Sequence, residues 1–207
     1  MAEMTAAQHL RNADPVMAKL ITRLGPTDLK PRRLPPFQAL AKAIVYQQLS
    51  GAAAATILKR FKMLFEGKAF PTPAQVLQLD VDRLRTAGLS RPKANYIRDL
   101  AQKTIDGVVP TLRECDRLTD AELVERLTRI KGVGRWTVEM LLIFNLGRPD
   151  ILPVHDLGVR RGYKIAYRKR TDPTPEQLDR SGIRWSPQRT IAAWYLWRAA
   201  DGLADEN

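Results

Sequence analysis

Two groups of residues in this 207-residue sequence could do chemistry: a glycine-rich turn flanked by cations, and a carboxylate further along the chain. The turn reads K-G-V-G-R over residues 131–135, and the carboxylate is Asp156. Glycine allows a left-handed turn and a close backbone approach. The N–H groups at the start of a following helix can hold an anion. With Lys131 and Arg135 beside them, the anion that fits best is a nucleic-acid phosphate.

Helices must lie on both sides of this turn for it to present those N–H groups. Thr119 and Glu122 have the spacing of a capping box, which predicts a helix that starts near Asp120. Apolar residues from Trp136 to Leu146 predict a second, buried helix. The sequence between them therefore predicts a helix, a tight hairpin and a helix. Any all-α protein can contain such a turn, so the pattern alone leaves DNA binding open.

Asp156 precedes another predicted helix, so it stands at or near an N-cap. A carboxylate in this place can simply cap the helix that begins at Leu157, a contribution of about 1 kcal/mol. It can also stabilise positive charge that develops on a substrate. Its position alone favours the cap, and the two roles are compatible.

Three stretches occur in an order that resembles a known family. They are A-I-V-Y-Q-Q-L-S-G-A-A-A (43–54), I-K-G-V-G-R-W-T (130–137) and L-P-V-H-D-L-G-V (152–159). Together they resemble the helix–hairpin–helix (HhH-GPD) DNA glycosylases, in particular the 3-methyladenine DNA glycosylase II, or alkylpurine, branch. The resemblance spans roughly residues 36–200 and implies an all-α, two-lobed fold of roughly ten helices. It implies a central lobe over 36–146, and a discontinuous lobe from 1–35 and 147–207 that carries the catalytic aspartate beside the inter-lobe cleft.

The resemblance implies an enzyme of base-excision repair. It would be a monofunctional glycosylase that hydrolyses the N-glycosidic bond of alkylated purines, such as 3-methyladenine and 7-methylguanine, flipped out of double-stranded DNA. One alternative is a non-catalytic helix–hairpin–helix module that only binds DNA. Another is a glycosylase for a different purine lesion, such as hypoxanthine or ethenoadenine.

Within that family, Asp156 matches the carboxylate that acts on the sugar. A fixed anion there stabilises the oxocarbenium character of the breaking bond and can orient the attacking water. Many bifunctional relatives carry a lysine where this chain has Trp136, and that amine forms a Schiff base that leads to strand cleavage. Its absence predicts base release by water without strand scission.

The resemblance also suggests roles for the remaining site residues. Residues expected to bind DNA are Lys131, Gly132, Val133, Gly134, Arg135 and Thr137. Residues expected at the base pocket are Trp136, Met140, Trp197 and Gln47, of which Met140 is equally compatible with a core position. The residue expected to wedge into the duplex is Gln48 or Leu49. An electron-rich pocket suits a cationic base through cation–π attraction. His155 could contact a phosphate or the attacking water, but a simple loop position fits it better.

The charge balance agrees with a polyanionic partner. Lys and Arg number 34 against 22 Asp and Glu, a formal net charge of +12. On a helix, Arg160, Lys164 and Arg168 are spaced by four and would form one basic stripe. A solvated face is the alternative interpretation of such a run.

We expect no cofactor and no catalytic metal. The single cysteine, Cys115, excludes an internal disulfide and a four-cysteine iron–sulfur cluster. The two histidines, His9 and His155, are too few and too far apart for a zinc site unless several carboxylates join them. The resemblance leaves room for a monovalent cation held by hairpin carbonyls.

The rest of the sequence predicts further helices and a soluble protein. There is no long apolar run and no signal peptide at the N-terminus, so we expect a cytoplasmic monomer that is nucleoid-associated in a prokaryote. The turn at 87–91 faintly repeats the 131–135 turn and predicts a second hairpin. Further predicted helices cover Pro15–Leu24, a stretch from Phe37 to near Ser50, Ala52–Phe65, short segments from Thr72 and Asp80, Ser90–Ile105, a segment capped by Thr174 and Gln177, and Pro187–Asp201.

Overall fold

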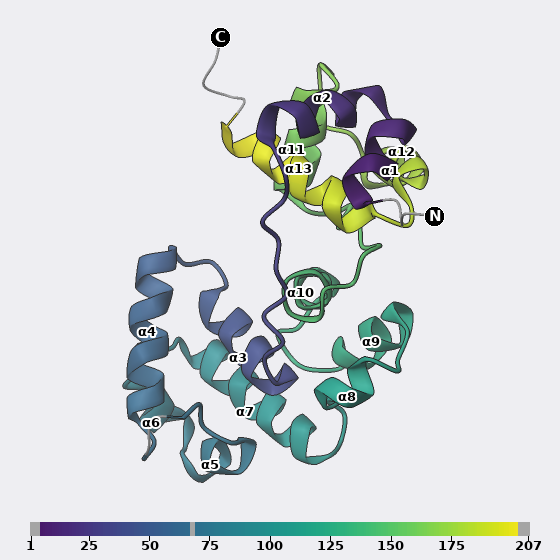
Figure 1. Cartoon of the computed structure of the whole chain (residues 1–207). Coiled ribbons are helices and arrows are strands. Elements are labelled where there is room, and N and C mark those ends of the chain that lie inside the picture. The colour runs from purple at the N-terminus through teal and green to yellow at the C-terminus, as the bar shows by residue number, and fades with distance from the viewer. Residues whose placement is uncertain (1–4, 67–68, 203–207) are drawn as a thin grey trace. The chain divides into compact units, whose positions relative to one another are not determined.

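The chain is all-α, as predicted. The computed structural model describes residues 5–66 and 69–202, which form thirteen α-helices, one π-helical and one 3₁₀ segment and no β-strand (Figure 1). The count exceeds the roughly ten expected because short segments such as α1 and α8 were not predicted. No helix in the described part is long and apolar enough to cross a membrane.

The chain divides into two compact units. Arg32–Leu141 forms the first, called here the central unit, and Met1–Pro31 with Leu142–Asn207 forms the second, called the terminal unit. The sequence had placed these divisions at residues 36 and 147.

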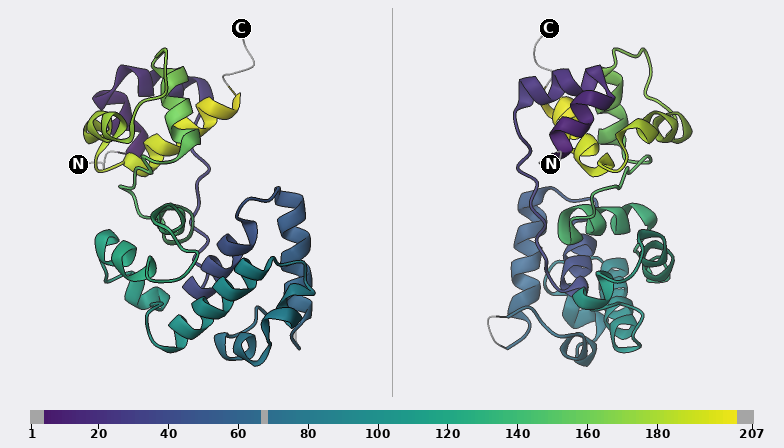
Figure 2. Two further views of the ribbon diagram at one scale, coloured as in Figure 1. Left: turned by 180° about the vertical axis from the view of Figure 1, so that it is seen from behind. Right: turned by 45° about the vertical axis from the view of Figure 1, so that its right-hand side comes forward.

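The central unit is arranged around its longest helix, α7. Two other views (Figure 2) show this helix running beneath α3, and it packs against α3, α5 and α6. The helices of this unit are α3 (Pro36–Tyr46), α4 (Gly51–Met63), α5 (Pro73–Gln78), α6 (Val81–Arg85), α7 (Arg91–Ile105), α8 (Leu112–Cys115), α9 (Asp120–Leu127) and α10 (Arg135–Leu141).

Side-chain caps define where these helices begin. Thr72, Asp80, Ser90 and Thr119 each accept a hydrogen bond from the main-chain N–H three residues on. Each cap satisfies an N–H group that the helix itself leaves unpaired. All four helix starts had been predicted and are confirmed.

Arginine side chains satisfy carbonyls where two of the helices end. The Arg98 guanidinium donates to Leu77 O at 3.2 Å, and also to Leu79 O, at the end of α5. Arg126 donates to Val108 O at 2.7 Å, and also to Gly107 O, after the end of α7. The last carbonyls of a helix lack internal partners and carry partial negative charge, so a cation there both satisfies and stabilises them.

The terminal unit is built on the pair α11 and α13, which pack along each other. Their backbones come close at Gly162, where an added Cβ would lie 1.8 Å from Leu196 O. The elements of this unit are α1 (Ala6–Ala13), α2 (Pro15–Leu24), the π-helical η1 (Leu142–Leu146), α11 (Leu157–Ala166), α12 (Pro175–Gly182), the 3₁₀ segment η2 (Ile183–Trp185) and α13 (Arg189–Gly202).

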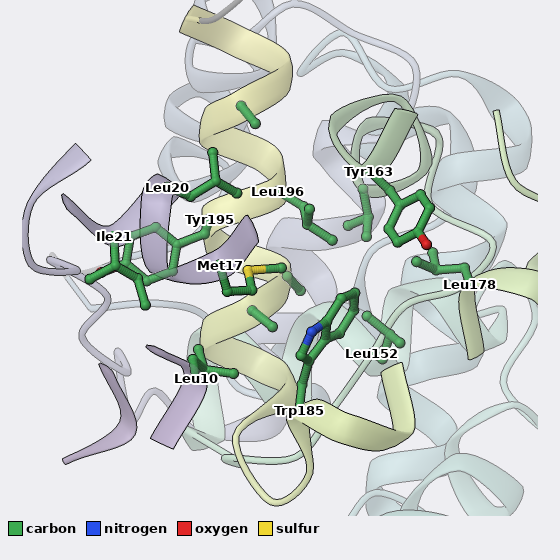
Figure 3. Packing of buried hydrophobic residues seen from close by; sticks show 14 residues of the cluster. Leu10, Met17, Leu20, Ile21, Leu152, Tyr163, Leu178, Trp185, Tyr195 and Leu196 are labelled. Carbon is green, nitrogen blue, oxygen red and sulfur yellow. The ribbon is translucent and has the colours of Figure 1, made fainter. Parts of the chain in front are cut away.

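Residues from both ends of the sequence form the hydrophobic core of the terminal unit (Figure 3). Its larger side chains are Leu10, Met17, Leu20, Ile21, Leu152, Tyr163, Leu178, Trp185, Tyr195 and Leu196. Asp14, which is only 1% exposed, lies beside this core and caps α2 by accepting from Val16 N at 2.9 Å. Its other oxygen accepts from Tyr167 Oη at 2.5 Å and Trp185 Nε1 at 3.0 Å. The carboxylate thereby joins three segments that are distant in the sequence.

The predicted basic stripe does not form. Helix α11 ends at Ala166, and Arg168 lies beyond it with a left-handed φ of 51°. Arg160 Nε donates to Pro173 O at 2.7 Å and so ties α11 to the following loop. The prediction assumed a longer helix, which the spacing of charges cannot establish.

Two other predicted helices differ at their ends. The apolar run 136–146 is α-helical only to Leu141 and continues as the π-helical η1. The last helix begins at Arg189 rather than Pro187, and Arg189 pairs with Asp150 at 2.8 Å there.

Replacing Asp14 tests how much this buried cap contributes to the free energy of unfolding. Asp14→Ala leaves a buried indole N–H and a phenol without their acceptor, so we expect the free energy of unfolding to fall by about 3 kcal/mol. Asp80→Ala, which removes the exposed cap of α6, should cost about 1 kcal/mol. Urea unfolding followed by circular dichroism measures both, and equal losses would contradict the role given to Asp14.

Candidate active site

The 131–135 turn connects α9 to α10, as predicted. Two main-chain hydrogen bonds close it: Ile130 N donates to Leu127 O at 3.2 Å, and Val133 N donates to Ile130 O at 3.0 Å. The side chains of Ile130 and Val133 are buried, which anchors the turn to the central unit.

Gly132 is required by the geometry of this turn. Its φ is 80°, and an added Cβ would lie 2.3 Å from Cδ2 of Tyr96 on α7. Gly134 differs, because its φ is not positive and no heavy atom lies within 4 Å of the position of an added Cβ. The first glycine therefore serves the fold, whereas the second leaves open space at the start of α10.

The cations beside the turn are exposed, but one of them has an acidic neighbour. Arg135 Nε lies 2.9 Å from Oε1 of Glu139, whose side chain is only 5% exposed. Sequence reasoning missed Glu139, although the spacing of four residues on a helix could have indicated the pair. The Thr137 side chain is also buried, so any contact of Thr137 or Val133 with DNA would use the main chain.

Two residues predicted for the base pocket share one side of α10. Trp136 is 46% exposed, and Met140 follows one turn later and is half-buried. Nearly half of the Trp136 side chain is accessible, and an indole combines a large apolar face with a polar N–H group, so it can contact a ligand.

The wedge candidates lie on the turn that connects α3 to α4. Gln48 adopts a left-handed φ of 57°, and both it and Leu49 are exposed. The side chain of Gln47, by contrast, is bound to the hairpin, because its Nε2 donates to Gly132 O at 2.9 Å. This contact between the two turns was not predicted.

Asp156 caps α11, as predicted. Its Oδ1 accepts from Val159 N at 2.9 Å and also from Nε1 of Trp197, on α13, at 2.9 Å. Both donors meet the same oxygen, so they fix the orientation of the whole carboxylate. Trp197 had been predicted as a pocket wall, and the structure adds a hydrogen bond to the candidate catalytic group.

Two further residues complete the surroundings of this carboxylate. A Cβ at Gly158 would lie 2.9 Å from Cδ1 of Trp197 and 3.1 Å from Oδ1 of Asp156, so glycine permits their close approach. Phe144 packs on Trp197 with 5.5 Å between ring centroids. Neither was predicted; for Gly158 the signal was its place two residues after Asp156. His155 is exposed.

The turn at Gly88 confirms the predicted second hairpin. It connects α6 to α7, and its glycine has a φ of 97° where Gly132 has 80°. Leu89 is buried, as Val133 is.

Comparison with known proteins decides the family. Residues 41–188 match the model of the HhH-GPD superfamily base excision DNA repair proteins. The chain belongs to this superfamily. It is 40% identical over 210 residues, 99% of this chain and 91% of the relative, to DNA-3-methyladenine glycosylase 1 of Schizosaccharomyces pombe.

Two solved structures of 3-methyladenine DNA glycosylases or glycosidases agree with this assignment. The 3-methyladenine DNA glycosylase of S. pombe in complex with abasic DNA superposes with a TM-score of 0.86 at 39% identity, with 98% of both chains covered. A DNA-3-methyladenine glycosidase from Bacillus halodurans gives a TM-score of 0.88 at 36% identity, with 97% of this chain and 91% of that chain covered.

No metal site is evident in the part of this HhH-GPD protein that the structure describes. Across residues 5–66 and 69–202, no three His, Cys, Asp or Glu side chains gather in a way that could hold a metal ion.

The two hairpin glycines should respond differently to the same substitution. Gly132→Ala places a Cβ against Tyr96 and forces a left-handed φ on alanine, so we expect a loss of about 2 kcal/mol in unfolding free energy. Gly134→Ala has room for its methyl group and should keep wild-type stability. If a phosphate binds the main chain at this turn, as the sequence predicts, that methyl would nevertheless obstruct its approach.

Urea unfolding and fluorescence anisotropy with a labelled duplex at fixed salt measure the two effects. We expect Gly134→Ala to bind duplex DNA more weakly while it unfolds like wild type. Unchanged binding by this variant would contradict a phosphate contact at the hairpin.

Proposed function

We propose that this protein is a monofunctional DNA glycosylase that removes alkylated purines from double-stranded DNA in base-excision repair. Its substrates would be 3-methyladenine, 7-methylguanine and similar bases, and its products the free base and abasic DNA. It would act as a monomer at chromosomal DNA, without a redox cofactor or a catalytic metal.

The observation that carries this proposal is the fixed carboxylate of Asp156. The chain is similar, over nearly its whole length, to a DNA-3-methyladenine glycosylase, and the family resemblance assigns the catalytic role to this residue. The N-terminus of α11 and the indole of Trp197 hold one of its oxygens. A charge that is already oriented before the reaction needs no reorganisation as the transition state forms, and this is the condition for strong electrostatic catalysis.

The reaction assigned to this group is a hydrolysis at the sugar. The bond between C1′ and the purine nitrogen breaks, and its electron pair leaves with the base. Positive charge then develops on the sugar, where Asp156 stabilises it. Water forms the new bond to C1′ and gives up one proton to the carboxylate of Asp156 or to the solvent. A purine that is already cationic leaves as a neutral molecule, so the reaction does not require a strong general acid.

On the central unit, base recognition is assigned to the electron-rich side chains of Trp136 and Met140. An aromatic face attracts a cationic base more strongly than a neutral one. Such selectivity is modest per ring, which agrees with a preference for a class of alkylated purines rather than for one base.

The hairpin is assigned to the DNA strand. Main-chain N–H groups near Gly134 would hold a phosphate, with Lys131 and Arg135 adding long-range attraction. The carboxylate of Glu139 offsets part of the positive charge of Arg135. Lys131 should therefore contribute more than Arg135 to the salt dependence of DNA binding. A monovalent cation on hairpin carbonyls would be a further aid to phosphate binding.

Asp156→Asn tests the enzymatic assignment. Asparagine keeps the capping oxygen, so the variant should fold and bind duplex DNA like wild type. We expect its rate of base release from methylated DNA to fall by at least about a hundredfold. Single-turnover release of labelled base is the measurement, and Asp172→Asn, at a half-exposed aspartate of the same unit, is the control.

A non-catalytic DNA-binding module gives a different result. Wild type would then release no base, although both wild type and Asp156→Asn would still bind duplex DNA. Wild-type release that survives the substitution would remove Asp156 from the mechanism but keep the enzyme.

The missing hairpin lysine predicts a product without strand breaks. On a duplex that contains one methylated purine, purified protein should generate an abasic site that is cut only after alkali treatment. Borohydride should trap no protein on the DNA, because Trp136 stands where bifunctional relatives carry the lysine that forms the Schiff base. A trapped complex, or nicked strands before alkali treatment, would contradict hydrolysis by water alone. EDTA should leave the rate unchanged.

A further inference from the structure

One side of α7 supports both turns that carry the predicted DNA-contacting residues of the central unit. Lys93, Tyr96 and Asp99 are spaced by three, so they share a side of the helix. Each of them meets the wedge turn, defined here as residues 47–50, or the hairpin turn, defined as residues 131–134. None of the three was among the predicted site residues.

Lys93 holds the start of the wedge turn. Its Nζ donates to Val45 O at 2.8 Å and to Gln47 O at 2.6 Å, where α3 ends. Burial lowers the pKa of Lys93 below its ordinary value of 10.5. Both acceptors are main-chain carbonyls, so the ammonium group is placed against the backbone itself.

The hairpin turn rests on the next two residues of the same side. Lys131 N donates to Oδ2 of Asp99 at 2.9 Å. The Tyr96 ring packs against Gly132 so closely that a Cβ there would lie 2.3 Å from it. The hairpin therefore has both a polar and a steric contact with α7.

Gln47 joins the two turns directly. Its main-chain oxygen accepts from Lys93 Nζ, and its side-chain Nε2 donates to Gly132 O at 2.9 Å. The lysine thus fixes the residue whose side chain reaches the hairpin. Gln48 and Leu49 follow at once with exposed side chains, and Leu49 N donates to Tyr46 O at 3.4 Å, at the end of α3.

We propose that Lys93 is a positioning residue for nucleotide eversion, which through Gln47 makes the wedge turn and the hairpin turn one rigid body. This inference rests on the proposed function. With the strand held at the hairpin, Gln48 or Leu49 enters the base stack at a fixed distance from the held phosphate. Eversion costs a few kcal/mol of base stacking and pairing. A side chain on a mobile turn would be displaced instead of filling the space that the everted base leaves in the stack.

A positioning role of this kind should matter only when a base must be forced out of the duplex. The experiment therefore compares one methylated purine in two duplexes, opposite its normal partner and opposite an abasic site, where it is unpaired. Loss of a charged hydrogen bond typically changes a rate by about tenfold. We expect Lys93→Met to slow single-turnover release from the paired duplex by about that factor while release from the unpaired duplex changes little.

Two matched variants control for folding and for charge. Arg98→Met removes the other α7 cation that donates to two carbonyls, but at the end of α5, and it should leave the paired-to-unpaired ratio at the wild-type value. Lys93→Arg can still donate to both carbonyls and should restore most of the paired rate. If Lys93→Met slows both duplexes equally, or neither, the positioning role is overturned.

Amide hydrogen exchange of the free protein supplies a readout that does not depend on catalysis. We expect Lys93→Met to raise exchange at residues 47–50 and 131–134 together, whereas Arg98→Met raises it near 77–80. A rise confined to the wedge turn would overturn the coupling. Wild type that is inactive on both duplexes would instead overturn the proposed function, and the exchange result would still test whether the turns are joined.

Discussion

Hydrogen bonds from cationic side chains to main-chain carbonyls organise the central unit. Lys93, Arg98 and Arg126 each donate to two carbonyls where a helix ends. Short helices leave a large share of their carbonyls without an internal partner. In an all-helical unit made of such helices, the ends rather than the middles therefore decide how the chain is arranged. Both turns assigned to DNA depend on this arrangement through α7.

The terminal unit uses the opposite device, a carboxylate at a helix N-terminus. Asp14 caps α2 and accepts from the Trp185 indole, and Asp156 caps α11 and accepts from the Trp197 indole. The same chemistry thus occurs twice, in different surroundings. Asp14 is buried and also bound by Tyr167, so it serves the core. Asp156 is only half-buried, and this difference in access suits it for chemistry.

Net charge overstates how many cations face a nucleic acid. The formal charge of +12 predicted a polyanionic partner, yet several of the cations bind groups of the protein itself. Arg160 is bound to Pro173 O, and Arg135 is paired with the buried Glu139. The positive charge available to a polyanion is therefore smaller than a count of residues suggests, and exposed side chains such as Lys131 supply it.

The sequence by itself determined the helix starts that carry a side-chain cap at Thr72, Asp80, Ser90 and Thr119, the glycine turn and the order of the three motifs that resemble the family. Caps and turns join residues three or four apart, so their spacing is visible in the chain. Only the tertiary structure decided that Gln47 reaches Gly132 across 85 positions and that Trp197 reaches Asp156 across 41. It also decided that α11 ends before Arg168. Periodicity shows which face of a helix is buried, but the partner of a side chain depends on which elements pack there, and no local pattern encodes that.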